Sequence, residues 1–297
     1  MLACVKAPGS CGELVQGTLE GQNFLVTCPI DLFSTATVSK SPKVSFTNVG
    51  QKTRQAVTKT VQQLKIGAKF QLLIDSELPQ GKGMASSSAD ISAACYALAL
   101  SAGKTLTPDE IADIAISVEP TDGVFFPGIA MLDHVSGKDR ILLGNPPPIT
   151  IALFDVGGEI DTLYFNQRLD LKRLNDEKEP KVRQALNLVI QGIQSGDAGL
   201  IGQGATLSAL ANQSILYKPC LNTVIELAKQ YGAIGVNAAH SGTVLGIMFR
   251  SDQLVHYEQC IAAVQRSCRE INFMQTVRLI SGGLRIVGEK NGYSHSV

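Results

Sequence analysis

A loop followed by a serine-rich segment contains the residues of this chain best suited to chemistry. Residues 78–99 are LPQGKGMASSSADISAACYALA, so Pro, Gly and Lys lead through three serines into an alanine-rich apolar stretch. Gly81 and Gly83 permit positive φ angles, and the first amides of a helix are unpaired at the positive end of its dipole. Such a helix start binds phosphate, although serines there could equally cap a core helix. Residue chemistry alone leaves these two interpretations about equal.

The same loop offers groups that could assist phosphate binding. Serine hydroxyls can donate hydrogen bonds to phosphate oxygens or coordinate Mg²⁺, and Lys82 can add a positive charge. The loop is not a Walker A motif, because that motif requires Gly-Lys-Ser/Thr and here Lys82 precedes Gly83.

The elements that must position this loop follow from hydrophobic periodicity and turn signals. A helix is predicted over 107–119 (TPDEIADIAISVE), with Thr107 as N-cap and Pro108 in the first turn. The prolines of 144–150 (GNPPPIT) predict a connector between two lobes, 1–146 and 147–297. The other predicted strands are 2–7, 11–17, 23–30, 34–40, 69–75, 150–156, 233–239, 243–249 and two near the C-terminus, and the other helices are 51–66, 177–195, 197–211, 219–231 and 252–268. This order predicts an α+β fold with two lobes.

The composition excludes several functional classes. With 26 basic and 26 acidic residues among 297, the net charge is zero, which argues against a nucleic-acid partner. No apolar run is long enough for a membrane span, and MLACVKAPG does not resemble a secretory leader. The seven cysteines and four histidines are scattered without CxxC spacing, so neither a disulfide framework nor a transition-metal site is expected. We therefore expect a cytoplasmic protein.

Three segments of the chain resemble the three sequence motifs of the GHMP kinases. Residues Pro79 to Ala89 resemble the signature Pro-x-x-x-Gly-Leu-Gly-Ser-Ser-Ala, with Met84 in place of Leu and Ala85 in place of the second Gly. Because alanine disfavours positive φ, the loop is expected to turn differently at Ala85. Lys6 to Gly17 (KAPGSCGELVQG) resembles the first motif, and Ala238 to Phe249 (AAHSGTVLGIMF) resembles the third.

This resemblance implies a fold and two cofactors. The fold would be two-lobed α+β, with an N-terminal lobe like ribosomal protein S5 and a ferredoxin-like C-terminal lobe. The cofactors would be ATP and Mg²⁺, with Ser87 and Glu119 as metal ligands. The residues implied for binding the nucleotide phosphates are Gly81, Lys82, Gly83, Met84, Ala85, Ser86, Ser87 and Ser88. The alternative for Glu119 is a solvated charge at a helix end, but a glutamate at a helix C-terminus is unfavourable with the dipole.

Asp122, three residues after Glu119, is the candidate catalytic group on the acceptor side. Its segment TDGVFFPG resembles ADVPFF of the diphosphocytidyl-methylerythritol kinases, where the aspartate faces the acceptor hydroxyl. Asp122 could accept the hydroxyl proton or only orient the hydroxyl. The alternative is a turn aspartate before Gly123.

Four segments, PGSCGELVQG, CPIDLFSTATV, GKGMASSSADI and EPTDGVFFPGIAMLDH, resemble the branch of the superfamily that phosphorylates L-threonine in bacterial cobalamin biosynthesis. An amino-acid substrate needs an anion for its ammonium group and cationic or amide donors for its carboxylate. Asp31 is the first candidate for the ammonium group and Glu13 the second, and Ser10 is also expected near the substrate. The candidates for the carboxylate are His134, His240 and Arg285.

Two alternatives to a threonine kinase follow from the same residues. One is a GHMP kinase for another hydroxylated metabolite, such as homoserine. The other is a non-catalytic relative that senses a ligand, against which the combination of Ser87, Glu119 and Asp122 argues. The expected partners are small molecules, without nucleic acid or membrane, and a homodimer is compatible with the sequence.

Overall fold

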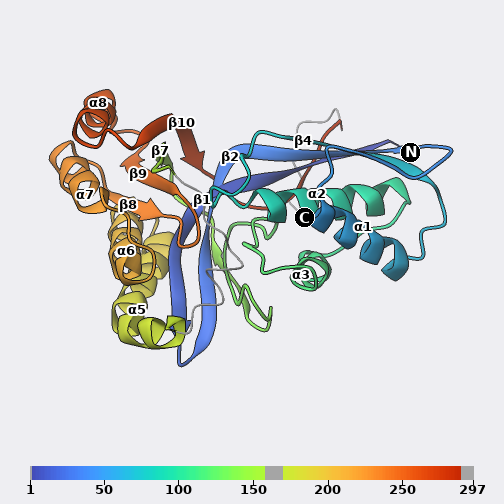
Figure 1. Cartoon of the computed structure of the whole chain (residues 1–297), viewed down its shortest axis with the longest axis horizontal. Helices are drawn as coiled ribbons and strands as arrows, with labels where there is room; N and C mark the ends of the chain where they lie inside the picture. The colour runs from blue at the N-terminus through green and yellow to red at the C-terminus, as the bar shows by residue number, and fades with distance from the viewer. Residues whose placement is uncertain (1, 158–169, 289–297) are drawn as a thin grey trace.

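The computed structural model describes residues 2–157 and 170–288 (Figure 1). Two long antiparallel strands, β1 (Ala3–Leu19) and β2 (Gln22–Lys40), form a hairpin that runs through both halves of the molecule. The prediction of four short strands in this region was wrong. Register shifts at Pro8/Gly9 and on either side of Glu13 absorb the irregular residues as bulges, so each strand bends and continues.

The N-terminal half packs three helices against the hairpin. The strands β4 (Phe70–Ser76) and β3 (Ser45–Thr47) extend the sheet beyond β2, and β5 (Ile129–Leu132) and β6 (Arg140–Gly144) form a second hairpin on it. Helices α1 (Gln51–Gln63), α2 (Ser86–Ser101) and α3 (Pro108–Ile116) lie together on one side of these strands (Figure 1).

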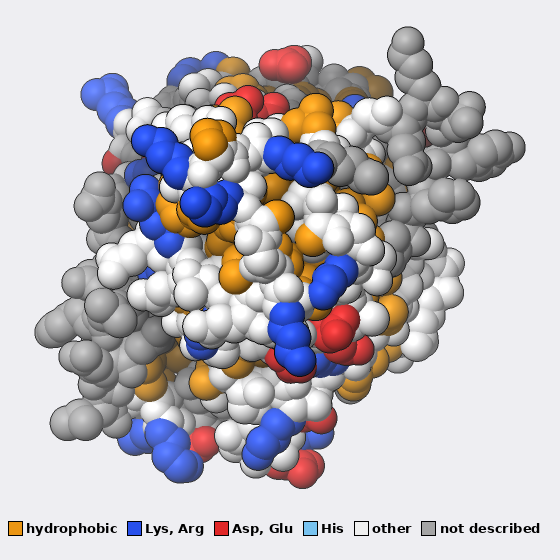
Figure 2. All heavy atoms as spheres, turned by 90° about the vertical axis from the view of Figure 1, so that its right-hand side faces the viewer, with side chains coloured by type: hydrophobic (Ala, Val, Ile, Leu, Met, Phe, Trp, Pro, Cys, Tyr) orange, Lys and Arg blue, Asp and Glu red, His pale blue; other side chains and the backbone are white. Residues whose placement is uncertain are grey.

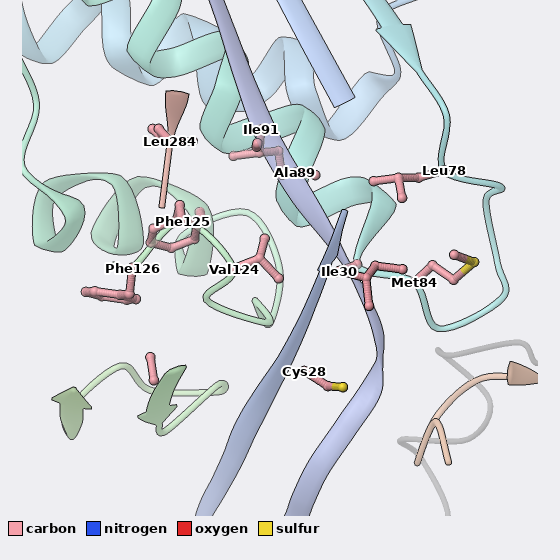
Figure 3. Packing of buried hydrophobic residues seen from close by; sticks show 14 of the residues in the cluster. Cys28, Ile30, Leu78, Met84, Ala89, Ile91, Val124, Phe125, Phe126 and Leu284 are labelled. Carbon is pink, nitrogen blue, oxygen red and sulfur yellow. The ribbon is translucent and has the colours of Figure 1, made fainter. Parts of the chain in front are cut away.

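Helix α2 is the central helix of this half. Every residue from Ser88 to Ala99 is buried, which fits an alanine-rich helix that is apolar on all sides. Leu78 and Met84, which bracket the preceding loop, belong to the same core cluster as Ile30 of β2 and turn their side chains inward (Figure 3). The loop therefore approaches α2 with both ends anchored in the core.

Helix α3 begins as predicted and ends earlier than predicted. The Thr107 side chain and Glu110 form a capping box at its start. The last helical residue is Ile116, so Glu119 lies beyond the helix and the predicted end at 119 was wrong. Glu119 therefore does not oppose the helix dipole from inside the last turn of α3.

The C-terminal half is built on a four-stranded antiparallel sheet in the order β8-β9-β7-β10. This sheet joins the long hairpin at both edges, where Ala238 pairs with Glu13 and Leu279 pairs with Ile30. Its strands are β7 (Ile149–Asp155), β8 (Gly235–Ala238), β9 (Val244–Arg250) and β10 (Asn272–Leu279), with the short β11 (Arg285–Ile286) paired to β1. The helices are α5 (Leu171–Ser195), α6 (Ala198–Ala211), α7 (Leu221–Gln230) and α8 (Tyr257–Ser267).

Helices α5 and α6 pack against each other and against β1, while α7 and α8 cover the outer part of the sheet (Figure 1). Helix α8 starts at Tyr257, five residues later than predicted. Residues 145–148 connect β6 to β7 without regular structure, as the prolines predicted. A lobe boundary at 146/147 stays a prediction.

Two features bear on whether nucleic acid or a membrane is a partner of this protein. On the face shown in Figure 2, which the N-terminal half forms, Lys and Arg side chains are scattered among acidic, apolar and uncharged surface. Within residues 2–157 and 170–288, no helix is both long and apolar enough to cross a membrane.

Candidate active site

Three segments far apart in the sequence meet at the loop before α2. The backbone N–H of Ser10 donates to Met84 O at 3.0 Å, and that of Gly12 donates to Gly83 O at 3.1 Å. From the other side, the N–H of Thr243 donates to Lys82 O at 2.9 Å. The regions that resemble the three GHMP motifs therefore build one structural unit.

Gly83 is required at the centre of this contact. Its φ is +80°, and a Cβ there would lie 2.6 Å from the Ala239 Cβ and 2.9 Å from the Gly242 Cα. Neither neighbour can move without displacing the turn between β8 and β9. The contact therefore fixes the position of the loop relative to the turn between β8 and β9.

Ala85 adopts the conformation that the sequence argument ruled out. Its φ of 55° and ψ of 25° are left-handed, and it is the N-cap residue of α2. The prediction that the loop avoids positive φ here was wrong, because Met84 on one side and α2 on the other hold the backbone in place at a cost of about 1–2 kcal/mol. No side chain caps α2, so capping does not account for the serines that follow.

Ser87 and Glu119 form the first pair of functional side chains. The Ser87 Oγ donates a hydrogen bond to Oε1 of Glu119, whose Oε2 makes an ion pair with the Lys52 ammonium of α1. The Glu119 side chain is 17% exposed, whereas that of Lys52 is 60% exposed. An exposed lysine can leave such a pair at little energetic cost.

This pair fits a magnesium ion. A carboxylate and a hydroxyl are hard oxygen donors, and Mg²⁺ is usually held by one or two carboxylates together with substrate phosphates and water. Among the residues that the structure describes, no group of three His, Cys, Asp or Glu side chains could hold a metal by itself. The oxygen donors of Ser87 and Glu119 are therefore of the kind to which phosphate oxygens are added to complete the coordination of Mg²⁺.

Ser88 and Asp122 form the second pair. The Ser88 Oγ donates to Asp122 Oδ2 at 3.2 Å and accepts hydrogen bonds from the Asp122 N–H and the Thr121 hydroxyl, each at 3.1 Å. Burial, together with the nearby Glu13 and Glu119 charges and against the opposing Ser88 hydrogen bond, raises the pKa of Asp122 to about 7. Asp122 therefore changes its protonation state near neutral pH.

Glu13 is buried beside Asp122, at a point where β1 is bulged on both sides. Its Oε2 accepts hydrogen bonds from the His240 backbone N–H at 2.9 Å and from the ring Nδ1 at 3.1 Å. The other ring nitrogen, Nε2, lies 3.1 Å from the Ser208 hydroxyl of α6. Burial lowers the pKa of His240, so the neutral ring donates to Glu13 through Nδ1 and accepts from Ser208.

Glu13, Asp122 and His240 form one cluster. Of the other residues predicted to bind the substrate, Asp31 and Arg285 lie apart from this cluster, and His134 is the exception. Asp31 accepts hydrogen bonds from the backbone N–H of Arg278 at 2.7 Å and from its Nε at 3.0 Å, in an exposed ion pair. Arg285 stacks over the Phe33 ring at 4.7 Å. The exception is His134, whose pKa responds to the charges of Glu13 and His240.

Two further predicted residues already have protein partners. The Ser10 hydroxyl donates to the carbonyl oxygens of Gly12 and Cys28, so it holds the bulge of β1. The Lys82 ammonium makes an ion pair with Asp155 Oδ2 at 2.9 Å.

A polar cavity of about 270 Å³ lies beside the loop. Leu78 and Gln80 of the loop and Asp90 of α2 contribute to its wall. The remaining lining residues are Asn48, Ile74, Asp75 and Ser76.

Several residues of the site carried no signal in the sequence. Lys52 lies in an ordinary polar helix, and Ser208 lies in an alanine-rich one. Lys178 and Lys218, which are buried close to His240, resemble surface lysines in their local sequence. Only the fold brings these residues to the site.

Comparison with known proteins assigns the family. The models of the GHMP kinase N-terminal and C-terminal domains match residues 52–126 and 189–268. The chain is 30% identical over 290 residues to the L-threonine kinase of Salmonella typhimurium, covering 96% of both chains. The homoserine kinase of Cytophaga hutchinsonii has the same fold, with a TM-score of 0.72, 16% identity and coverage of 96% of this chain and 97% of that one. A solved complex with MVAPP, AMPPCP and magnesium has a TM-score of 0.68 at 14% identity, covering 96% of this chain and 98% of that one.

The chain therefore belongs to the GHMP kinases, and the predicted α+β GHMP fold is confirmed.

Proposed function

We propose that this protein transfers the γ-phosphoryl group of ATP to the side-chain hydroxyl of L-threonine. The product, O-phospho-L-threonine, would serve the aminopropanol linker of cobalamin in the cytoplasm. The observation that carries the proposal is the meeting of Ser87–Glu119 and Ser88–Asp122 at the start of α2, with Glu13 buried alongside. Phosphoryl transfer needs positioned groups and charge neutralisation, which these pairs supply. The name of the Salmonella relative supports threonine as the acceptor.

On the nucleotide side, the loop of 81–88 and the first amides of α2 would bind the phosphates. Ser87 and Glu119 would hold Mg²⁺, which neutralises charge on the phosphate oxygens when it is bound. The polar cavity lined by Leu78 and Gln80 is the proposed site of the adenine ring, because these two residues lie immediately before the phosphate loop in the sequence.

On the acceptor side, Asp122 would orient the threonine hydroxyl and accept its proton. A pKa of about 7 leaves a large carboxylate fraction at neutral pH, and a base with that pKa is well matched to working near it. Ser88 fixes the carboxylate from the other side, and its two acceptor bonds hold its own hydroxyl in place.

An acceptor panel tests the assignment. With purified protein and Mg-ATP, we expect L-threonine to have a higher kcat/KM than L-homoserine, L-serine, mevalonate and galactose. Equal or better turnover of homoserine would show that the threonine assignment is wrong. Tight binding of Mg-ATP with no phosphorylation of any acceptor would instead indicate a ligand sensor.

Glu13 rather than Asp31 should bind the ammonium group. Glu13 is buried next to Asp122, whereas Asp31 is engaged by Arg278 in an exposed pair. We expect Glu13→Gln to raise the KM for threonine by roughly 100-fold, because it removes a buried charge that faces the ligand. Asp31→Asn is the matched control and should change that KM less than about threefold.

Steady-state kinetics with threonine varied at saturating ATP measure both variants. The reverse result, a large KM effect for Asp31→Asn and none for Glu13→Gln, would move the amino-acid site to the Arg278 side of β2.

A further inference from the structure

Two lysines of the C-terminal half are buried, and no carboxylate among the residues that the structure describes is hydrogen-bonded to them. Lys178 of α5 is 6% exposed, and Lys218, which precedes α7, is 3% exposed. The Lys178 Nζ donates to the Asn212 side-chain oxygen at 3.0 Å, and the Lys218 Nζ donates to the Ala239 carbonyl at 2.8 Å. Both acceptors are neutral. Burying an ammonium on neutral acceptors is unfavourable, so these two lysines call for an explanation.

Both lysines converge on the turn that also holds Glu13. A single peptide group, between Ala239 and His240, accepts from Lys218 through its oxygen and donates to Glu13 through its N–H. The Asn212 amide that accepts from Lys178 donates to the His240 carbonyl at 3.3 Å. The two lysines and Glu13 are therefore all linked to the turn at Ala239 and His240.

The charges around this turn do not balance. In the described ranges 2–157 and 170–288, Glu13 is the carboxylate whose charge acts on both lysines, so two ammonium groups lie near one carboxylate. Burial lowers the pKa of each lysine to about 8, with Glu13 acting in the opposite direction. Both lysines therefore remain mostly protonated at neutral pH, and within the described part of the chain the positive charges at this turn outnumber the negative ones.

A second observation indicates that a polar ligand belongs here. The Nδ1 atom of His134 is buried, and no residue that the structure describes forms a hydrogen bond with it. The pKa of His134 responds to the charges of Glu13 and His240, which places its ring within the same cluster. His134 and Asp122 are only partly buried, so the cluster reaches solvent on that side.

We infer that Lys178 and Lys218 bind the α-carboxylate of the amino-acid acceptor, with Glu13 facing its ammonium group. The inference rests on the function proposed above and adds the feature that selects amino acids among hydroxylated compounds. A zwitterion supplies a carboxylate to the lysines and an ammonium group to Glu13, so that each buried charge gains a partner of opposite sign. Because Glu13, Lys178 and Lys218 are buried, each of these ion pairs would be stronger than it would be at the surface.

Methionine substitutions test the inference, because they keep the length of the side chain and remove its charge. We expect Lys178→Met and Lys218→Met each to raise the KM for L-threonine by about 100-fold, with the KM for ATP changed less than about threefold. The matched controls are Lys181→Met on α5 and Lys229→Met on α7, both exposed, which should leave both KM values unchanged.

A substrate pair separates carboxylate recognition from general damage. Threoninol has the same amine and side-chain hydroxyl as threonine but lacks the α-carboxylate. The wild-type protein should prefer threonine by at least about 100-fold in kcat/KM, and each methionine variant should lose most of that preference. Lys178→Arg and Lys218→Arg keep the charge and should fall between wild type and the methionine variants.

Thermal melting provides a readout besides activity. Removing a buried charge that lacks an ionic partner should leave the melting temperature of the ligand-free variants equal or higher. The increase that L-threonine produces in the wild-type melting temperature should disappear. Variants that melt lower, keep the wild-type KM and still prefer threonine over threoninol would overturn the inference, since the lysines would then be structural. A wild-type protein that phosphorylates neither compound would instead contradict the proposed function.

Discussion

Ser87→Ala and Glu119→Gln should each lower kcat by roughly 100- to 1,000-fold at saturating ATP and threonine. The two side chains meet through one hydrogen bond at the start of α2, next to a loop that two other segments of the chain hold in place. Each substitution removes or weakens a proposed ligand of the Mg²⁺ that would neutralise charge on the transferred phosphoryl group. The loss should therefore appear mainly in kcat, with the KM for threonine nearly unchanged.

Titration of Mg²⁺ makes this prediction specific. Both variants should require a higher Mg²⁺ concentration for half-maximal activity, and binding of a non-hydrolysable ATP analogue should become less dependent on Mg²⁺. Ser101→Ala, at the far end of α2, is the matched control, because its hydroxyl only bonds the Leu98 carbonyl of its own helix. Rates near wild type in both Ser87→Ala and Glu119→Gln would show that the magnesium site lies elsewhere.

The sequence sufficed to predict the loop and the helix start that we propose to bind the nucleotide phosphates. Its local pattern of Gly, Lys and Ser lies within one loop and one helix start, where spacing along the chain determines spacing in space. Glu119 was also predicted as a metal ligand. The prediction that it ends helix α3 was wrong, because α3 ends at Ile116. The turn after that helix, rather than the helix itself, brings the carboxylate to Ser87.

The acceptor side could not be predicted in the same way. Lys178 lies in the charged run NDEKEPK, which is typical of a solvated helix face. Its burial depends on how α5 packs against β1 and α6, and no local pattern encodes that packing. The choice between Asp31 and Glu13 was also open, because only the bulges of β1 decide which carboxylate points toward Asp122.

Asp122→Asn should lower kcat by roughly 100- to 10,000-fold, the range typical of a lost general base. The pH profile identifies the role of the residue. Because the pKa of Asp122 is raised to about 7, the carboxylate that accepts a proton forms as the pH rises through 7. The kcat of the wild-type protein should therefore increase through this range and level off above it.

In Asp122→Asn this increase should be absent from the residual activity. The neighbouring histidines do not account for a step at 7, since burial lowers the pKa values of both His134 and His240 below their usual range. A variant that keeps the step would show that another group titrates, and a loss of only about tenfold would reduce Asp122 to orienting the hydroxyl.

The same shift predicts an effect on stability of opposite sign to the effect on activity. The pKa of Asp122 is higher in the folded protein than the ordinary value of 3.8, so the folded state holds its proton more tightly than the unfolded state. The contribution of the neutral carboxyl is fully present below pH 4 and is lost as the pH rises to 7. Asparagine does not ionise, so Asp122→Asn should be more stable than wild type at pH 8 by about 1–3 kcal/mol and nearly equal to it at pH 4. Urea unfolding at the two pH values measures this difference. A variant that is less stable than wild type at pH 8 would show that the surroundings stabilise the Asp122 carboxylate, which contradicts a raised pKa.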